Sequence, residues 1–309
     1  DTHTVSVDWG EGPPEAATVN QGAGAGTFSA SHRYLDDDPT GTPSDTYTIT
    51  VTVTDDDTGS DSDTTSVTVD NVDPVITDIV SSATFEDKAE EGETVTVSGT
   101  FSDVGTLDTH TATIDWDDGT VEPATVVQGS GGGSFTADHA YAAGGVFTVT
   151  VTITDDDTGT TSDTVFAVVT GVGINGGVLQ VVGTSGGDMV HVKRIQDEID
   201  AFADFIGNEH RRYDLAAVNS IEIWLCEGDD HGNVHQSIDL PAVIHGGDDD
   251  DMLWGGSGPD VIEGEDGNDK LWGRPGDDEL FGGPGNDNLW GGAGNDLLDG
   301  GPGNNKLKQ

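Results

Sequence analysis

Residues 246–308 read GGDDDDMLW, GGSGPDVIE, GEDGNDKLW, GRPGDDELF, GGPGNDNLW, GGAGNDLLD and GGPGNNKLK, which are seven consecutive blocks of nine residues. Position 1 of every block is Gly, position 6 is Asp in six blocks and Asn in the last, and position 8 is always Leu or Ile. A flexible linker has no reason to keep three positions in phase over this length. The stretch therefore predicts a solenoid whose folding depends on a metal ion.

The nonapeptide has too little apolar surface to fold on its own. Glycines at positions 1, 2 and 4 permit a tight turn, and the apolar position 8 should point inward from a short strand. One buried aliphatic side chain contributes roughly 1.5–3 kcal/mol, whereas ordering the chain costs about 1–2 kcal/mol for each residue. Carboxylates at position 6 and freed backbone carbonyls are hard oxygen ligands that suit Ca²⁺. The predicted inward residues are Leu253, Ile262, Leu271, Leu280, Leu289, Leu298 and Leu307.

These blocks resemble the RTX calcium-binding nonapeptide, G-G-x-G-x-D-x-U-x. The resemblance implies a right-handed parallel β-roll in which turn n stacks on turn n+2, about 4.8 Å away, with Ca²⁺ between stacked turns. The metal ligands would then be the position-6 residues Asp251, Asp260, Asp269, Asp278, Asp287, Asp296 and Asn305.

The resemblance also implies how these ligands pair. Two carboxylates would share a site in the pairs Asp251–Asp269, Asp269–Asp287, Asp260–Asp278 and Asp278–Asp296. The fifth pair, Asp287–Asn305, would be weaker because an amide replaces a carboxylate. The roll should therefore hold about four to five Ca²⁺ ions.

Some blocks depart from the pattern. Asp249 replaces Gly at position 4 of the first block, Pro259 lies in the second, and Glu265 and Asp266 crowd the third. We therefore expect the first turn to be distorted or to bind Ca²⁺ less tightly.

Position 9 carries three tryptophans, Trp254, Trp272 and Trp290, at intervals of 18 residues. Stacking of turn n on turn n+2 would place them in one ladder on one side of the roll. One interpretation is aromatic stacking that stabilises successive rungs, and this is the one we favour. The other is a contact strip for a glycan, a protein partner or another roll.

The charge balance restricts the possible partners. The 309 residues include 10 Lys and Arg against 59 Asp and Glu, a formal net charge of −49. Nucleic acid is excluded because phosphate needs a basic footprint, and no apolar stretch is long enough for membrane insertion. Such a charge repels itself unless cations bind or screen it. The single Cys226 rules out an internal disulfide, and the alternation in 221–226 predicts that it is buried.

A second repeat relates residues 1–72 to residues 108–173. The matching segments are DTHTVSVDWGEG (1–12) with DTHTATIDWDDG (108–119), FSASHRY (28–34) with FTADHAY (135–141), and YTITVTVTDDDTG (47–59) with FTVTVTITDDDTG (147–159). Alternating Thr and Val between Gly/Asp turns predicts short antiparallel strands of a β-sandwich. The order of these segments resembles the PKD domain, an Ig-like sandwich common in secreted bacterial proteins.

The fold class predicted for the whole chain is all-β. We expect a partial PKD-like sandwich that lacks its first strands, a complete one with leading strands near 75–80 and 94–101, irregular leading coils of the solenoid, and the RTX-type roll. The corresponding ranges are 1–72, 73–173, 174–245 and 246–309.

The sandwich modules contain conspicuous Trp, His and Asp residues. Trp9 with His32, and Trp116 with His139, occupy matching positions, and we interpret them as core and turn-stabilising residues rather than catalytic ones. The Asp triplets at 55–57 and 155–157 predict hairpin turns. A Ca²⁺ site at the 70–74 linker, near Asp70 and Asp73, is an alternative, as in cadherin-like stalks.

Residues 174–245 predict strands without a regular nonapeptide. GTSGGDMVH (183–191) fits the repeat at positions 1, 4, 6 and 8, which makes Asp188 a weak calcium candidate. The segment 227–234 is interpreted as a turn without Asp at position 6. We expect these coils to begin near Gly177 and to cap the apolar end of the solenoid.

No segment carries a convincing catalytic motif. A zinc protease would need H-E-x-x-H, and His231-Gly-Asn-Val-His235 lacks the Glu. Gly183-Thr-Ser-Gly-Gly187 matches the spacing G-x-S-x-G but lies in a repeat turn rather than between a strand and a helix. The chain is therefore predicted not to be an enzyme.

The predicted function is that of a non-catalytic extracellular segment, a stalk, adhesive region or spacer whose roll folds on binding Ca²⁺ outside the cell. Calcium is the predicted partner, with a cell-surface or extracellular glycan or protein as a further one. The alternative is a glycan- or protein-binding accessory region of a secreted hydrolase whose catalytic domain lies outside these residues. Because Asp1 falls in what reads as mid-strand, we expect the chain to be part of a longer protein.

Overall fold

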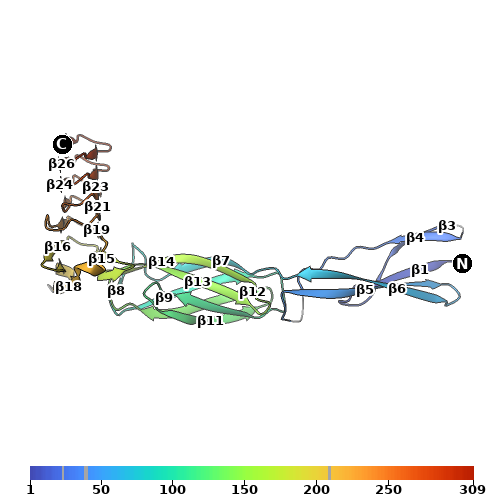
Figure 1. Cartoon of the computed structure of the whole chain (residues 1–309). Coiled ribbons are helices and arrows are strands. Elements are labelled where there is room, and N and C mark those ends of the chain that lie inside the picture. Colours follow the sequence, from blue (N-terminus) through green and yellow to red (C-terminus); the bar gives the residue numbers. More distant parts are fainter. Residues whose placement is uncertain (23, 38–40, 208–209) are drawn as a thin grey trace.

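The computed structural model describes residues 1–22, 24–37, 41–207 and 210–309. These residues form β-strands and two short 3-10 turns, η1 (Asp204–Ile206) and η2 (Leu215–Ala217). Two elongated sandwich modules lie in a row, and a solenoid rises across their axis at the C-terminal end (Figure 1). In the described part of the chain, no helix has the length and apolarity needed to cross a membrane. The all-β prediction is confirmed.

The first module is an open arrangement of six strands. Its sheet has the antiparallel order β2-β1-β5-β6, and β3 pairs with β4 in a separate hairpin. The strands are β1 (His3–Asp8), β2 (Glu15–Ala16), β3 (Thr18–Gly22), β4 (Ala25–Ser29), β5 (Ser44–Asp55) and β6 (Ser60–Asp70). Val5, Val7 and Tyr47 are buried, but Phe28 on the hairpin is 48 % exposed, so this core is only partly covered.

The second module is a closed sandwich. Its strands are β7 (Val75–Ser81), β8 (Ala89–Glu90), β9 (Thr94–Ser102), β10 (His110–Asp115), β11 (Val121–Gly129), β12 (Gly132–Ala140), β13 (Gly145–Asp155) and β14 (Thr160–Asn175). They follow the order β14-β13-β10-β11-β12-β9-β7, with β8 parallel to β14. Strands β7 and β9 have no counterpart among the described residues of the first module. They cover a core in which Trp116, Phe135 and Tyr141 are at most 2 % exposed.

The matching Trp, His and Tyr residues have the predicted structural roles. The Tyr141 hydroxyl donates to the Trp116 carbonyl at 3.0 Å, and His139 stacks on Trp116 with ring centroids 4.9 Å apart. In the first module Tyr34 donates to the Trp9 carbonyl at 2.6 Å. Trp9 is only half-buried, because no strands equivalent to β7 and β9 cover it.

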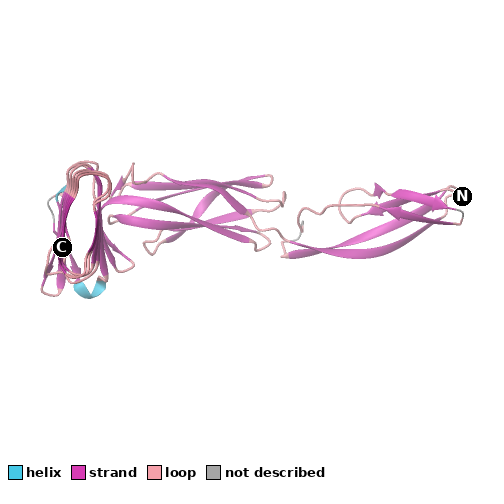
Figure 2. Cartoon of the chain, turned by 90° about the horizontal axis from the view of Figure 1, so that it is seen from above, coloured by secondary structure: helices cyan, strands magenta, loops and turns pink. Residues whose placement is uncertain are grey.

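The solenoid consists of two parallel sheets. One contains β15 (Val178–Val182), β19 (Ser220–Glu227), β21 (Ala242–Asp248), β23 (Asp260–Asp266), β25 (Glu279–Phe281) and β27 (Leu297–Asp299). The other contains β16 (Met189–Ile195), β20 (His231–Val234), β22 (Met252–Trp254), β24 (Lys270–Pro275), β26 (Asn288–Ala293) and β28 (Lys306–Lys308). At the N-terminal end of the solenoid, β17 (Glu198–Ala203) and β18 (His210–Asp214) extend the second sheet as antiparallel strands. Seen end-on, the turns superimpose in a flattened ring (Figure 2).

The register of the sheets confirms the stacking of turn n on turn n+2. Leu253 pairs with Leu271, and Leu271 pairs with Leu289. The predicted inward residues from Leu253 to Leu289 are fully buried, whereas Leu307 on the last rung is 50 % exposed. The same core continues back through Leu179 and Val190, so the solenoid begins before the regular blocks, as the sequence indicates.

The solenoid is joined to the second module by a continuous hydrogen-bonded sheet. The first part of β14 pairs with β13 of the sandwich, and its last part pairs with β15 of the solenoid. Glu91 and Arg211 form a two-pronged ion pair across the same boundary, with both N–O distances 2.5 Å. Cys226 was predicted to be buried, but it is only partly buried; it is the penultimate residue of β19 and has a φ of +82°.

Candidate metal centre

The position-6 side chains form two stacks inside the turns of the solenoid. In one stack the backbone N–H of Asp251 donates to Asp269 Oδ1 at 2.9 Å. In the other stack, the backbone N–H of Asp260 donates to Asp278 Oδ1 at 3.0 Å, and the backbone N–H of Asp278 donates to Asp296 Oδ1 at 3.2 Å. Five of the seven predicted ligands are at most 1 % exposed. The structure thus brings together, rung upon rung, the residues that the sequence analysis pairs.

Most of these carboxylates keep one oxygen without a donor. Buried Oδ2 atoms with no hydrogen-bond partner occur at Asp230, Asp251, Asp269, Asp278, Asp287 and Asp296. Position 1 must be Gly because a β-carbon on Gly264 would collide with Asp269 Oδ2 and lie 2.7 Å from the Gly282 carbonyl oxygen. A carboxylate and a carbonyl from the next rung therefore converge there. Buried acceptors that face each other are satisfied by a cation, so the donor set fits Ca²⁺.

Burial raises the pKa of these carboxyls because it removes water from the charged form. The pKa is raised to about 8 for Asp230 and Asp251, to about 7 for Asp260 and Asp269, and to about 6 for Asp278. Neighbouring carboxylates in the same stack raise it further. In the absence of a cation, the carboxyls of Asp230 and Asp251 would hold protons near neutral pH.

One stack extends beyond the predicted residues. The N–H of Asp230 donates to Asp251 Oδ1 at 2.8 Å, and the N–H of Asp188 donates to Asp230 Oδ1 at 2.6 Å. The prediction that the 227–234 turn has no Asp at position 6 was wrong, because the fully buried Asp230 occupies it. The nonapeptide pattern did not identify Asp230 because 21 residues, rather than 18, separate it from Asp251. In addition, Gly232 stands where the other blocks have Leu or Ile, as its pairing with Leu253 shows.

Side chains at three positions in the stacks are already hydrogen-bonded within their own turns. Asp188, the weak candidate, accepts from the Thr184 N–H at 2.7 Å and from its hydroxyl at 2.9 Å. Asn305 donates through Nδ2 to the carbonyls of Gly300 and Gly301. The third is Asp260, whose Oδ2 accepts from the Gly256 N–H at 2.6 Å. These positions offer fewer open oxygens than the central rungs.

Arg274 places a guanidinium beside Asp260. It stands at position 2 of its block, where other blocks have Gly or Glu, and its Nη1 donates to the carbonyls of Val234 and Gly255 at 2.8 and 2.9 Å. The positive charge lowers the pKa of Asp260 against the raising effect of burial. The guanidinium of Arg274 therefore supplies part of the positive charge that would otherwise come from a bound cation on this rung.

Position 5 carries a second ladder that the sequence analysis missed. Asn268 donates through its N–H and through Nδ2 to Asp250 Oδ1, both at 2.8 Å, and Asn286 repeats the pattern on Asn268. On the other side Asn295 donates to Asp277 at 2.9 Å. The available signal was the recurrence of Asn or Asp at position 5 in six of the seven blocks.

Comparison with protein-family models agrees with this geometry. A model for the RTX calcium-binding nonapeptide repeat (4 copies) matches residues 245–280 and 272–307, and a model for the PKD domain matches residues 71–170. The chain contains RTX calcium-binding repeats and a PKD domain. The RTX roll therefore binds calcium. No curated protein matches the chain.

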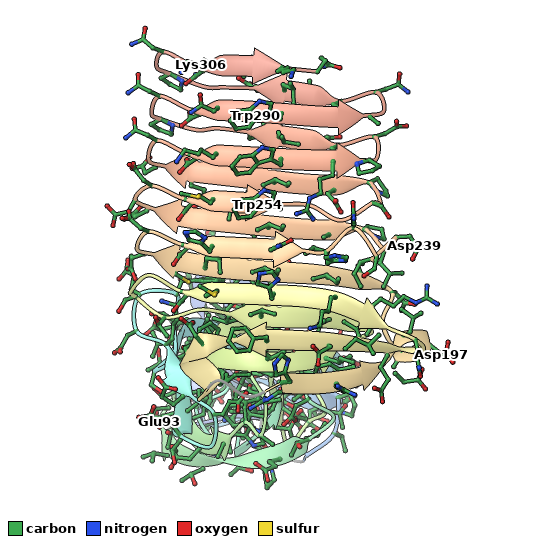
Figure 3. The ribbon with its side chains drawn as sticks, turned by 90° about the vertical axis from the view of Figure 1, so that its left-hand side faces the viewer. Glu93, Asp197, Asp239, Trp254, Trp290 and Lys306 are labelled. Atoms are coloured by element: carbon green, nitrogen blue, oxygen red, sulfur yellow. The ribbon has the colours of Figure 1, made fainter. Side chains whose placement is uncertain are left out.

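The tryptophans of the RTX roll form a continuous stack. Trp254, Trp272 and Trp290 have ring centroids 4.6 and 4.8 Å apart, with planes inclined by 5° and 4°. Trp254 and Trp290 lie on one face of the roll (Figure 3). Each ring is half-buried, so its neighbours cover one part of it and solvent reaches another.

Of the motifs considered for catalysis, 183–187 lies in a turn of the leading coils and His231–Val234 forms strand β20. Ser185, the serine of the 183–187 segment, is exposed in a bend, and the neighbouring Thr184 hydroxyl donates to Asp188 at 2.9 Å. His235 Nδ1 accepts from the Ser237 N–H at 3.0 Å and lies 2.9 Å from the Ser237 hydroxyl, a local contact two residues apart. RTX repeats and PKD domains are both non-catalytic modules.

Proposed function

We propose that the chain is a non-catalytic extracellular spacer or stalk whose roll folds when it binds Ca²⁺ outside the cell. The observation that supports this most directly is the stack of buried carboxylates whose Oδ2 atoms have no donor. A ligand that binds only the folded state adds its binding free energy to stability. At low Ca²⁺, the same carboxylates and a net charge of −49 oppose folding of the roll.

We further propose the position-6 carboxylates as the ligands. The four two-carboxylate pairs of the regular blocks would hold an ion each, and Asp287–Asn305 would hold a fifth less tightly because Nδ2 of Asn305 already donates to two carbonyls. The pair Asp230–Asp251 adds a further rung of the same kind. We also propose the four-part division at residues 72, 173 and 245 as the domain organisation.

Hydrogen exchange of the full chain, followed by mass spectrometry, would test Ca²⁺-dependent folding. We expect peptides from 246–308 to exchange fast in EDTA and slowly in millimolar Ca²⁺, while peptides from the β9–β12 core of the PKD domain change little. Circular dichroism during a Ca²⁺ titration should show strand signal increasing in parallel. Equal protection of the roll peptides with and without Ca²⁺ would contradict the proposal.

A second candidate function is glycan or protein binding through the tryptophan ladder, as an accessory region of a secreted hydrolase. It is favoured by the half-buried rings of Trp254, Trp272 and Trp290, which present aromatic surface along one face. Glycan-array binding that Trp272→Ala abolishes while the roll still folds in Ca²⁺ would support it. Binding unchanged by the substitution, or absent from the wild-type chain, would exclude this ladder as the contact surface.

A further inference from the structure

The two sandwich modules meet at a cluster of carboxylates that lies far from the roll. Two groups of three carboxylates each have ligand oxygens within 4.8 Å of one another, and they share Asp108. The first group adds Asp36 and Asp103, and the second adds Asp156 and Asp157. Asp36 comes from the loop between β4 and β5 of the first module, and the other four come from two loops of the second module. The cluster therefore lies where the modules join end to end (Figure 1).

Two carboxylates of this junction are buried, and three of its carboxylate oxygens lack a donor. Asp36 and Asp157 are each 4 % exposed, and Asp36 Oδ2, Asp108 Oδ2 and Asp157 Oδ1 are buried without a hydrogen-bond partner. A β-carbon on Gly105 would collide with both Asp36 Oδ2 and Asp108 Oδ2, so these two oxygens converge on one point. Two unpartnered carboxylate oxygens from different modules thus face each other.

Backbone and side-chain donors fix the opposite oxygens of the same groups. The Val72 N–H donates to Asp36 Oδ1 at 3.0 Å, and the Thr109 N–H donates to Asp156 Oδ1 at 2.7 Å. His110 Nε2 lies 2.8 Å from Asp103 Oδ2. The carboxylates are held in place, and their remaining oxygens are left pointing toward one another.

The charge at the junction is not balanced by the described residues. Among these, no Lys or Arg pairs with any of the five carboxylates, and His110 is the one basic partner. The close approach of the modules therefore needs either protons or a cation.

We propose that this junction is a Ca²⁺ site that joins the two sandwich modules. Its ligands are carboxylates contributed by both modules: Asp36, Asp103, Asp108, Asp156 and Asp157. An all-oxygen, carboxylate-rich set with no thiolate or free imidazole selects a hard cation, and the number of carboxylates favours Ca²⁺ over Mg²⁺, which keeps several waters. The predicted linker site at Asp70 and Asp73 is replaced by this one, since both residues are exposed and belong to neither group.

The internal repeat supports this assignment. Asp1, Asp56 and Asp57 occupy in the first module the places that Asp108, Asp156 and Asp157 occupy in the second, and they also form a group of converging oxygens. The three residues of the first module are exposed, whereas at the junction Asp36 from a neighbouring module joins the set, Asp157 is buried and Asp108 is half-buried. The module thus carries half of a site at one end, and its neighbour completes it.

Hydrogen exchange of the full chain with and without Ca²⁺ would test the junction separately from the roll. In the wild-type chain we expect Ca²⁺ to slow exchange in peptides covering 103–109 and 71–75, by about tenfold at a free concentration ten times the dissociation constant. Asp36→Asn and, independently, Asp108→Asn should cancel this slowing while peptides from 246–308 keep their own response to Ca²⁺. The matched control is Asp56→Asn, the exposed equivalent of Asp156, which should leave the junction response intact.

Two results would overturn the proposal. One is exchange at 103–109 that is the same with and without Ca²⁺ in the wild-type chain. The other is a Ca²⁺ response that survives both Asp36→Asn and Asp108→Asn. If the junction tightens on acidification but not on adding Ca²⁺, protons rather than a metal neutralise it. Because the roll is followed by different peptides, failure at the junction and failure of the proposed roll function are distinguishable.

Discussion

At the scale of the residue, the decisive feature is a carboxylate with one satisfied and one unsatisfied oxygen. Asp269 accepts the Asp251 N–H on Oδ1 and keeps Oδ2 buried without a donor. The hydrogen bond fixes the side chain, and the open oxygen determines which ligand it can take. The sequence could predict this role because every block places Asp or Asn at the same position. It could not predict which carboxylates have a basic side chain of the protein nearby, as Asp260 has Arg274, because that depends on contacts between rungs.

Asp269→Asn should weaken Ca²⁺ binding to the roll by roughly tenfold or more, because a central ligand loses its charge and ligand charge governs Ca²⁺ affinity. Asp269 lies between Asp251 and Asp287, so the affinity of both adjoining rungs should fall. Isothermal titration calorimetry would measure the change. Asp266→Asn, which removes an exposed carboxylate three residues away, is the control and should bind as the wild type does. Equal loss in both variants would mean that overall charge, not the stack, governs affinity.

The raised pKa values predict opposite effects of pH on the Ca²⁺-free and Ca²⁺-bound roll. The folded pKa values of about 6 to 8 exceed the ordinary value of about 3.9, so between these limits the folded Ca²⁺-free roll holds protons that the unfolded chain has released. Its stability should therefore fall as pH rises from about 5 to 8. Ca²⁺ replaces the protons, so binding should release protons at pH 7 and weaken on acidification.

Thermal melts in EDTA and in Ca²⁺ across this pH range would measure the effect, and calorimetry in buffers of different ionisation enthalpy would count the protons released. Asp230→Asn should reduce both the slope and the count, whereas Asp266→Asn should leave them unchanged. A Ca²⁺-free roll that becomes more stable between pH 5 and pH 8 would contradict the prediction.

At the scale of the element, the period of 18 residues determines which side chains stack on one another in the roll. It places Leu on Leu in the core, Asp on Asp in the turns and Trp on Trp on the face, as the pairings of β22, β24 and β26 show. The sequence predicted these elements because the period is regular. It failed at β20, where three extra residues and Gly232 break the pattern although the stack continues through Asp230. An insertion at a turn changes the spacing without changing the rung, and only backbone pairing reveals this.

The tryptophan ladder should contribute measurably to the stability of the roll. Trp272→Ala removes the middle ring and both of its stacking contacts, at 4.6 and 4.8 Å, and should lower the unfolding free energy by about 2 kcal/mol. Trp272→Phe keeps an aromatic ring and should lose less. Thermal unfolding in saturating Ca²⁺, followed by circular dichroism, would measure both. Equal stability of the wild type and Trp272→Ala would leave a contact surface as the remaining role for the ladder.

At the scale of the whole molecule, the two junctions differ in what holds them. The second module is joined to the solenoid by backbone hydrogen bonds along β14 and by the Glu91–Arg211 pair. Among the described residues, the first module meets the second through carboxylates that have no Lys or Arg partner and only His110 as a basic one. The sequence predicted the modules from their repeats, but neither junction, because Asp36 and Asp108 are far apart in the chain and Arg211 lies 120 residues from Glu91. A spacer built this way would be permanently rigid at one junction and stiffened by Ca²⁺ at the other.

Loss of the Glu91–Arg211 ion pair should destabilise the junction between the second module and the solenoid. Arg211 donates to both oxygens of Glu91 and to the Val172 carbonyl at 2.8 Å, so Arg211→Met leaves a partly buried carboxylate unpaired and should lower the unfolding free energy by about 2 kcal/mol. Glu91→Gln should cost a similar amount, and the double variant little more, because both changes remove the same interaction. Calorimetric melts of the full chain in saturating Ca²⁺ would measure this, with Arg194→Met, an exposed site, as the control. Additive losses in the double variant would show instead that Arg211 and Glu91 stabilise their own modules separately and that this ion pair does not connect the sandwich to the roll.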